Sequence, residues 1–173
     1  MKRVPPAVLK KAARIKLLLL DVDGVLTDGR IIIDDRGVET KQFHVRDGQG
    51  ISLLIRAGIE VGFITGRASK IVQHRAKELG VRLIYQGVAD KRVAYIAIKR
   101  KTKRPDAEIA YVGDDFIDLP VLREAGLAIS ISDGWSELFS VVDYVTEQKG
   151  GSGAVREVAE LILKAQDKWP KLI

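Results

Sequence analysis

The stretch that decides the fold reads Leu17-Leu18-Leu19-Leu20-Asp21-Val22-Asp23-Gly24. An apolar run that ends at a turn signal is typical of a buried strand in a parallel sheet. Asp is a poor strand residue, so we expect Asp21 and Asp23 where this strand ends. Ligands of open α/β sheets bind just outside the carboxyl ends of the strands. The two acids therefore predict a site for a cation, for phosphate chemistry, or for both.

The composition is that of a globular protein. The 173 residues are 46% hydrophobic and 30% charged, and none is a cysteine. We expect a single domain over residues 1–173, and the lack of thiols excludes disulfides, thiolate zinc sites and a Cys nucleophile. No apolar run approaches the roughly 20 residues that span a bilayer, and no apolar segment of a secretory signal follows the basic N-terminus. We therefore expect a cytoplasmic protein with no membrane partner.

The formal net charge of +6 raises the question of nucleic-acid binding. The basic residues are scattered, and their one cluster, residues 99–104, lies where a helix is expected to end before Pro105. Cations at that position complement the helix macrodipole, and no aromatic side chains interleave with them as in many RNA-binding surfaces. We expect a solvated helix end, no nucleic-acid partner, and a field that attracts small anionic substrates.

Strands alternate with helices along the chain. This order predicts an α/β fold, a Rossmann-like doubly wound parallel sheet with helices on both faces. The strands are expected at 17–22, 60–64, 82–85, 108–112, 127–131 and 143–145. The helices are expected at 8–15, 50–57, 70–79, 91–100, 118–125, 136–139 and 154–168.

Two further features interrupt this alternation. A β-hairpin is expected after the first strand, over residues 30–33 and 38–45. The glycine-rich run 150–153 predicts a hinge for a C-terminal helix and tail over residues 150–173. About forty residues separate Asp23 from Thr65, and one hairpin, one helix and one strand already use them, so there is no room for a cap domain.

Polar residues recur at the ends of four predicted strands, which should meet at one rim of the sheet. Phosphoryl transfer needs a cation, donors for the phosphate oxygens, a nucleophile and an acid/base, and this rim supplies each of them. Carboxylates are ligands that Mg²⁺ prefers, and an Asp can form a covalent phosphoaspartate. The rim residues are Asp21, Asp23, Thr65, Arg67, Lys91, Asp114, Asp115 and Asp118.

The order of these motifs resembles that of the haloacid dehalogenase superfamily of phosphatases. The four signatures are Asp21-Val22-Asp23-Gly24-Val25, Thr65-Gly66-Arg67, Lys91, and Gly113-Asp114-Asp115-Phe116-Ile117-Asp118. Three longer stretches, residues 21–29, 43–48 and 150–157, look like the 3-deoxy-D-manno-octulosonate 8-phosphate (KDO 8-phosphate) phosphatases of its capless branch. The resemblance covers residues 15–168 and implies Mg²⁺-dependent hydrolysis of KDO 8-phosphate in lipopolysaccharide precursor biosynthesis. It also implies a homotetramer that the hairpin builds and in which neighbouring subunits close the site.

The resemblance assigns a role to each rim residue. Asp21 is the nucleophile, and Asp23 is the general acid and then the general base. Mg²⁺ is held by Asp21, the backbone carbonyl of Asp23, and Asp114, while Thr65 and Lys91 hold the transferring phosphoryl group. The remaining acids, Asp115 and Asp118, orient the ligands or Lys91.

The sugar end of the substrate carries a carboxylate, which the guanidinium fork of an Arg matches. The candidate substrate-binding residues are Arg46, Arg67, Arg75, Arg156 and Gly66. Relatives that act on nine-carbon sialic-type acids tend to carry Glu where this chain has Arg67, which favours the eight-carbon substrate. The alternatives are a nine-carbon acid 9-phosphate phosphatase and a non-catalytic binding or assembly module of the same fold. A signalling receiver domain is disfavoured, because here Lys91 precedes the Asp114-Asp115 pair.

Overall fold

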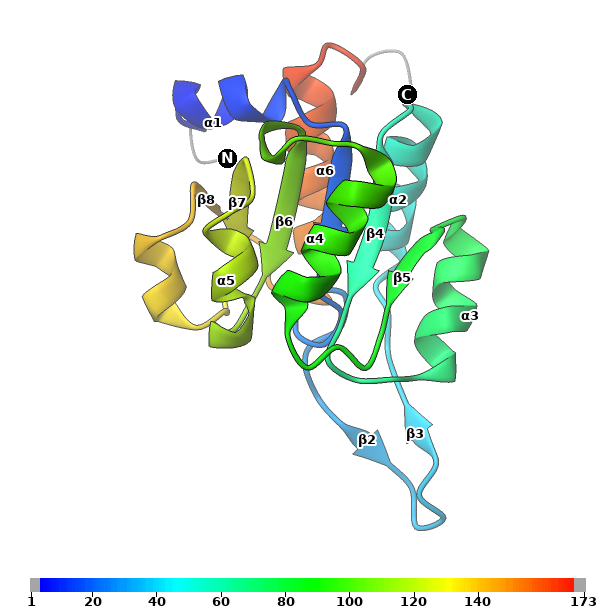
Figure 1. The fold of residues 1–173 in the computed structure, drawn as a ribbon. Helices are drawn as coiled ribbons and strands as arrows, with labels where there is room; N and C mark the ends of the chain where they lie inside the picture. Colours follow the sequence, from blue (N-terminus) through cyan, green and yellow to red (C-terminus); the bar gives the residue numbers. More distant parts are fainter. Residues whose placement is uncertain (1–3, 170–173) are drawn as a thin grey trace.

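A six-stranded, wholly parallel sheet forms the centre of the molecule (Figure 1). The computed structural model describes residues 4–169. The spatial order of the strands is β5-β4-β1-β6-β7-β8, so the chain starts at the centre, builds one side and then returns to build the other. The strands are β1 (Leu17–Leu20), β4 (Glu60–Ile64), β5 (Leu83–Tyr85), β6 (Ile109–Gly113), β7 (Leu127–Ser130) and β8 (Tyr144–Val145).

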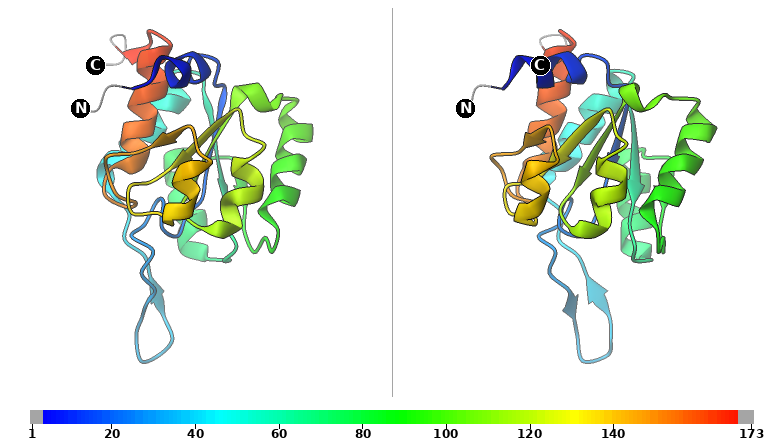
Figure 2. Two further views of the ribbon diagram at one scale, coloured as in Figure 1. Left: turned by 90° about the vertical axis from the view of Figure 1, so that its left-hand side faces the viewer. Right: turned by 60° about the vertical axis from the view of Figure 1, so that its left-hand side comes forward.

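Helices cover both faces of this sheet (Figure 2). The first face carries α1 (Pro6–Ala12), α2 (Val45–Arg56), α3 (Lys70–Leu79) and α6 (Ala154–Ala165). The second face carries α4 (Lys91–Thr102), α5 (Leu119–Leu122) and the 3₁₀ turn η3 (Ser136–Ser140). Two shorter 3₁₀ turns are η1 (Asp106–Glu108) and η2 (Phe116–Asp118).

The four leucines of β1 explain why the sheet is buried on both sides. Leu18 and Leu20 pack into the core of the first face, and Leu17 and Leu19 pack into the core of the second. Successive side chains of a strand point to opposite faces, so an uninterrupted apolar run is what a central parallel strand requires. The predicted doubly wound α/β fold is confirmed.

The hairpin after β1 projects from the body of the molecule (Figures 1 and 2). Its strands are only β2 (Ile32–Ile33) and β3 (Glu39–Thr40), so its ladder is much shorter than residues 30–33 and 38–45 would make. Between β1 and α2 the described chain holds this hairpin and no inserted domain.

Helix α2 begins at Val45, five residues before the predicted start at Gly50, and the prediction of strand up to residue 45 is wrong. Two glycines in the first half of the helix made this part look like a poor helix. The structure gives them a packing role. A Cβ on Gly50 would lie 3.1 Å from both the Cα of Arg156 and the Cβ of Ala159, so glycine lets α2 and α6 approach closely.

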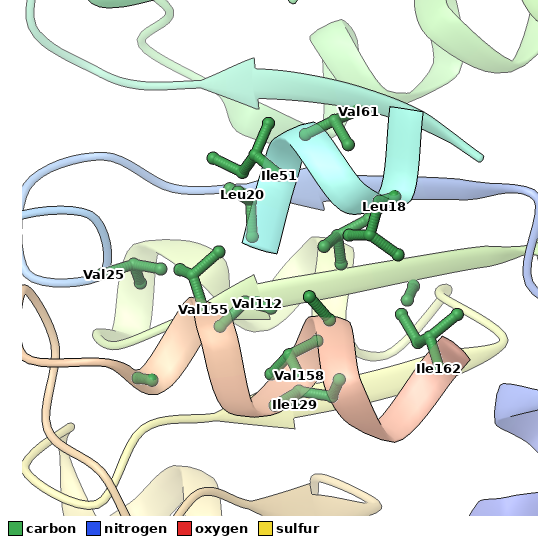
Figure 3. Close-up of a cluster of buried hydrophobic side chains, with 14 of the residues drawn as sticks. Leu18, Leu20, Val25, Ile51, Val61, Val112, Ile129, Val155, Val158 and Ile162 are labelled. Carbon is green, nitrogen blue, oxygen red and sulfur yellow. The ribbon is translucent and has the colours of Figure 1, made fainter. Parts of the chain in front are cut away.

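Helix α6 belongs to the hydrophobic core (Figure 3). Val155, Val158 and Ile162 face the strands from one side of the helix and are fully buried. Of the predicted C-terminal helix and tail over 150–173, residues 154–165 are therefore an integral part of the fold, and residues 170–173 lie outside the described part of the chain.

Two residues of the basic cluster 99–104 form ion pairs within the chain. Lys99 in the last turn of α4 pairs with Asp106 at 2.6 Å, and Arg104 pairs with Glu60 and Glu108 at 3.3 Å each. Part of the basic cluster is thus neutralised within the chain.

Over the described residues, no helix has both the length and the apolar character needed to cross a membrane.

The N-terminus of α6 is capped by a side chain from another helix. Gly153 at the N-cap position offers no side chain, and the buried carboxylate of Asp47 in α2 takes its place. It accepts hydrogen bonds from the backbone N–H groups of Gly153 at 3.2 Å and Arg156 at 2.8 Å. A carboxylate at a helix N-terminus also interacts favourably with the helix macrodipole.

We expect Asp47→Ala to lower the free energy of unfolding by about 1–3 kcal/mol, because it leaves the N–H groups of Gly153 and Arg156 at the start of α6 without an acceptor. Denaturant unfolding followed by circular dichroism measures the change. Asp35→Ala, at an exposed acid in the hairpin turn, is the matched control and should be nearly neutral. Equal effects of the two substitutions would contradict the capping role.

Candidate active site

The carboxyl ends of β1, β4 and β6 bring the predicted residues together. The register pairs Leu20 with Phe63 on one side and with Val112 on the other, so the three strands end at one level. Asp21 follows β1 and donates its N–H to the carbonyl of Val112 at 3.0 Å. Thr65 follows β4, and both Asp21 and Thr65 are buried.

Lys91 contributes a buried cation from the first turn of α4. Its Nζ lies 2.8 Å from Oδ1 of Asp21 and 2.6 Å from Oδ1 of Asp118. Burial by itself lowers the pKa of Lys91, but the two carboxylates outweigh this effect and hold the pKa above its ordinary value. The ammonium group is therefore charged across the physiological range.

Asp118 is the second acid that contacts Lys91, and it is fully buried. Its Oδ1 accepts hydrogen bonds from Lys91 and from the hydroxyl of Tyr111, and its Oδ2 accepts from the backbone N–H groups of Asp114 at 3.1 Å and Asp115 at 3.2 Å. Four donors thus fix both oxygens of one carboxylate. Asp118 thus holds Lys91 and the loop that carries Asp114.

Three carboxylates crowd together at this rim. One oxygen from each of Asp21, Asp114 and Asp118 lies within 4.8 Å of the other two. Burial and the neighbouring charges of Asp21 and Asp118 raise the pKa of Asp114 to about 8. Burial and the charge of Asp118 also raise the pKa of Asp21 to about 6, even though Lys91 lowers it. The site thus holds more negative charge than Lys91 balances.

A divalent cation fits this donor set. Both oxygens of Asp118 are already engaged, so Asp21 and Asp114 are the carboxylates with oxygen lone pairs left for a metal. Among the hydrogen bonds of the described residues, none uses the carbonyl oxygen of Asp23. Oxygen ligands of this kind suit Mg²⁺, and a cation would relieve the repulsion that raises the pKa of Asp114.

The hairpin brings Glu39 and Lys41 to the site, and sequence analysis did not single out either residue. Lys41, which follows β3, contacts Oδ1 of Asp23, and its Nζ lies 3.2 Å from Glu39. Arg67 donates to Glu39 at 2.7 Å, and its Nε lies 3.9 Å from Oδ2 of Asp23. The spacing Glu39-Thr40-Lys41 was the available signal, because alternate residues of an extended strand share a face.

Two of the other candidate arginines form ion pairs away from these carboxylates. Arg75 pairs with Glu78 at 2.8 Å. Arg156 pairs with Glu160 at 2.9 Å and, together with Arg46, lines a cavity of about 270 Å³ beside α6. Of the four arginines, the structure brings only Arg67 into contact with the site acids among the described residues. The fifth candidate, Gly66, lies next to Arg67, with room for a Cβ 3.7 Å from the nearest carbonyl.

Close backbone packing fixes the loop after β1. Gly24 has φ +100°, and a Cβ there would lie 2.0 Å from Oδ2 of Asp114. Gly150 lies directly behind this loop, since a Cβ on it would lie 1.6 Å from the carbonyl oxygen of Gly24. Gly151 adds a hydrogen bond from its N–H to the carbonyl of Val25 at 2.9 Å. The predicted hinge glycines 150 and 151 are therefore tightly packed against the loop that carries Asp23.

Comparison with known proteins gives a consistent set of relatives, although no family model matches the chain. The 3-deoxy-D-manno-octulosonate 8-phosphate phosphatase KdsC of Yersinia pestis is 48% identical over 161 residues, which cover 93% of this chain and 86% of the relative. The crystal structure of the corresponding phosphatase from Moraxella catarrhalis, in complex with magnesium ion, phosphate ion and KDO, has a TM-score of 0.93. It is 48% identical, and the match covers 95% of this chain and 94% of that one. The cobalt-bound phosphatase from Haemophilus influenzae has a TM-score of 0.88 at 39% identity, covering 91% and 92%.

We expect Gly24→Ala to lower kcat by at least about 100-fold, because the added Cβ displaces the carboxylate of Asp114 and the loop after β1 with it. Gly58→Ala is the matched control: Gly58 also has a positive φ, +79°, but a Cβ there meets nothing within 4 Å. It should cost about 1–2 kcal/mol of stability and leave kcat unchanged. Steady-state phosphate release measures both, and normal turnover by Gly24→Ala would contradict the packing argument.

Proposed function

The chain belongs to the KDO 8-phosphate phosphatase family of the haloacid dehalogenase superfamily, and from this we propose that it hydrolyses KDO 8-phosphate to KDO and phosphate with Mg²⁺ as cofactor. The observation that carries the proposal is the rim itself. Asp21 lies at the end of β1 with a charged Lys91 at 2.8 Å, and one oxygen from each of Asp114 and Asp118 lies within 4.8 Å of one of its own. A non-catalytic module would need none of this charge arrangement, which is costly to bury.

Asp21 is the proposed nucleophile of the first half-reaction. One of its carboxylate oxygens attacks phosphorus as the bond from phosphorus to the sugar oxygen breaks. Asp23 gives its proton to that departing oxygen, so the sugar leaves as an alcohol and the phosphoryl group remains on Asp21 as an acyl phosphate. Proton transfer by a positioned carboxyl group contributes about 10²–10⁴-fold to such a step.

The second half-reaction uses the same two acids. Asp23, now ionised, takes a proton from water as the water oxygen attacks phosphorus, and the bond between phosphorus and the Asp21 oxygen breaks. Inorganic phosphate leaves, Asp21 is again a carboxylate, and Asp23 is again protonated. Each residue returns to its starting state, so the cycle is complete.

Thr65 and Lys91 are the proposed donors to the transferring phosphoryl group. The hydroxyl oxygen of Thr65 accepts the N–H of Arg67 at 3.3 Å, which leaves the hydroxyl proton available to a phosphate oxygen. Preorganised donors of this kind are worth about 10²–10³-fold each. Asp21, Asp114 and the Asp23 carbonyl would hold the metal, which, when bound, neutralises charge on the phosphate oxygens.

Arg67 is the proposed determinant of the eight-carbon acid. Its guanidinium lies 2.7 Å from Glu39 at the open side of the rim, and a substrate carboxylate could replace that partner. Arg46, Arg75, Arg156 and Gly66 remain proposals for the substrate or for a neighbouring subunit's site. A nine-carbon acid 9-phosphate is the alternative substrate.

We further propose that the protein is a homotetramer built through the hairpin and that it acts in the cytoplasm on a precursor of lipopolysaccharide. Its hairpin strands are two residues each, too few for a free-standing hairpin in water. The hairpin also exposes a set of large apolar side chains, Ile31, Ile32, Ile33 and Val38. Contact with other copies would bury this surface and cover a rim that has no cap domain.

The substrate assignment predicts rapid phosphate release from KDO 8-phosphate with Mg²⁺ and none after removal of the metal by a chelator. Asp21→Asn should abolish turnover and leave the melting temperature near that of the wild type. Arg67→Glu should shift the ratio of kcat/KM toward a nine-carbon acid 9-phosphate. A wild-type enzyme that prefers the nine-carbon substrate would refute the eight-carbon assignment, and no release from any sugar phosphate would refute the enzyme itself.

The oligomer predicts a mass of four chains in light scattering. The double variant Ile31→Glu and Ile33→Glu should lower that mass, because it places two charges on each apolar hairpin. Val93→Glu changes an equally exposed valine on α4 and is the control that should leave the mass unchanged. A fully active wild-type monomer would exclude closure of the site by neighbouring subunits.

A further inference from the structure

Lys41 is a buried cation that the proposed mechanism does not yet use. Its side chain is 1% exposed, although it follows a hairpin strand whose neighbours face solvent. Lysine is almost never fully buried unless it is paired, because removing an ammonium group from water is costly. Two carboxylates, Asp23 and Glu39, compensate Lys41.

We propose that Lys41 is a positioning residue that fixes the orientation of the Asp23 carboxyl group for proton transfer. The inference rests on the proposed phosphatase function and deepens it. Lys41 contacts one particular oxygen, Oδ1 of Asp23. A lone pair of Oδ1 is therefore committed to the ammonium group, and in the acid form of Asp23 the proton sits on Oδ2.

The other oxygen has the freedom that proton transfer needs. Oδ2 of Asp23 lies 3.9 Å from Nε of Arg67, which is beyond hydrogen-bonding distance. It can therefore donate its proton to the departing sugar oxygen and later accept one from the attacking water. The task of Lys41 is therefore to hold one oxygen of Asp23 while the other oxygen reacts.

Glu39 and Arg67 hold Lys41 in place from the opposite side. Nζ of Lys41 lies 3.2 Å from Glu39, and Glu39 in turn accepts the hydrogen bond of Arg67 at 2.7 Å. The chain of charges runs from Arg67 through Glu39 and Lys41 to Asp23 and alternates in sign. The position of the catalytic acid thus depends on the hairpin and on the loop after β4, not on β1 alone.

The decisive experiment is the dependence of kcat/KM on the leaving group, measured with a series of substituted phenyl phosphates that carry no carboxylate. The parameter kcat/KM reports the steps up to formation of the phosphoaspartate, in which Asp23 donates its proton. A poor leaving group needs this proton and a nitrophenyl group does not. For Lys41→Met, we expect kcat/KM with phenyl phosphate to fall at least about tenfold more than with 4-nitrophenyl phosphate.

A plot of log kcat/KM against the pKa of the leaving phenol has a slope that reports how strongly the reaction depends on the leaving group. Lys41→Arg should restore most of the wild-type slope, because it retains a charged donor to Oδ1. A slope in Lys41→Met equal to that of the wild type would overturn the proposal and leave Lys41 with a binding or structural role. If Lys41→Met does not fold, Lys41→Gln allows the same comparison. We expect a steeper slope than that of the wild type, and an unchanged slope would again contradict the proposal. Lack of any activity in the wild type would instead refute the phosphatase function, so the two failures are distinguishable.

Discussion

The buried ammonium group of Lys91 is the interaction on which the active site depends. It lies within 2.8 Å of two carboxylates, and one of them, Asp118, in turn holds the loop that carries Asp114. Carboxylates packed this closely repel one another strongly in a medium of low dielectric constant. Because Lys91 begins α4, Asp21 directly follows β1 and Asp118 ends η2, this one charge joins three parts of the fold. With Asp114 beside Asp21 and Asp118, the carboxylates of the rim outnumber its one ammonium group, which explains why the rim suits a divalent cation.

The sheet and its functional rim were predictable because their signals are local. Apolar runs and the turns that end them specify β1, β4 and β6, and the polar residues that follow these strands lie where they were expected. The start of α2 was not predictable in the same way. Whether a glycine ends a helix or allows a second helix to approach depends on residues a hundred positions away, such as Arg156 and Ala159 beside Gly50. The partners of Lys41 and Arg75 were hidden for a similar reason, since a long charged side chain can reach many acids.

Several residues of the family-like stretches outside the rim have architectural roles. Asp47 caps α6, and Gly150 packs on the carbonyl of Gly24. Glu157 accepts the hydroxyl of Tyr144 at 2.7 Å and the N–H of Gln148 at 2.9 Å, so it ties the loop after β8 to α6. The last helix is thereby attached to the loop that carries Asp23. A stretch that reads as a flexible tail in the sequence acts as a rigid support for the site.

The position of β1 at the centre of the sheet has a consequence for how the site fluctuates. Ladders to β4 and β6 hold this strand on both edges, and helices bury both of its faces. Its amide hydrogens can exchange with solvent only when the whole domain opens, whereas a hairpin with two-residue strands can open alone. Asp21 therefore follows a strand for which we expect slow exchange, whereas Lys41 follows a hairpin strand for which we expect faster exchange. Asp21 keeps its place for as long as the protein is folded, while the contact of Lys41 with Asp23 also depends on the hairpin staying closed.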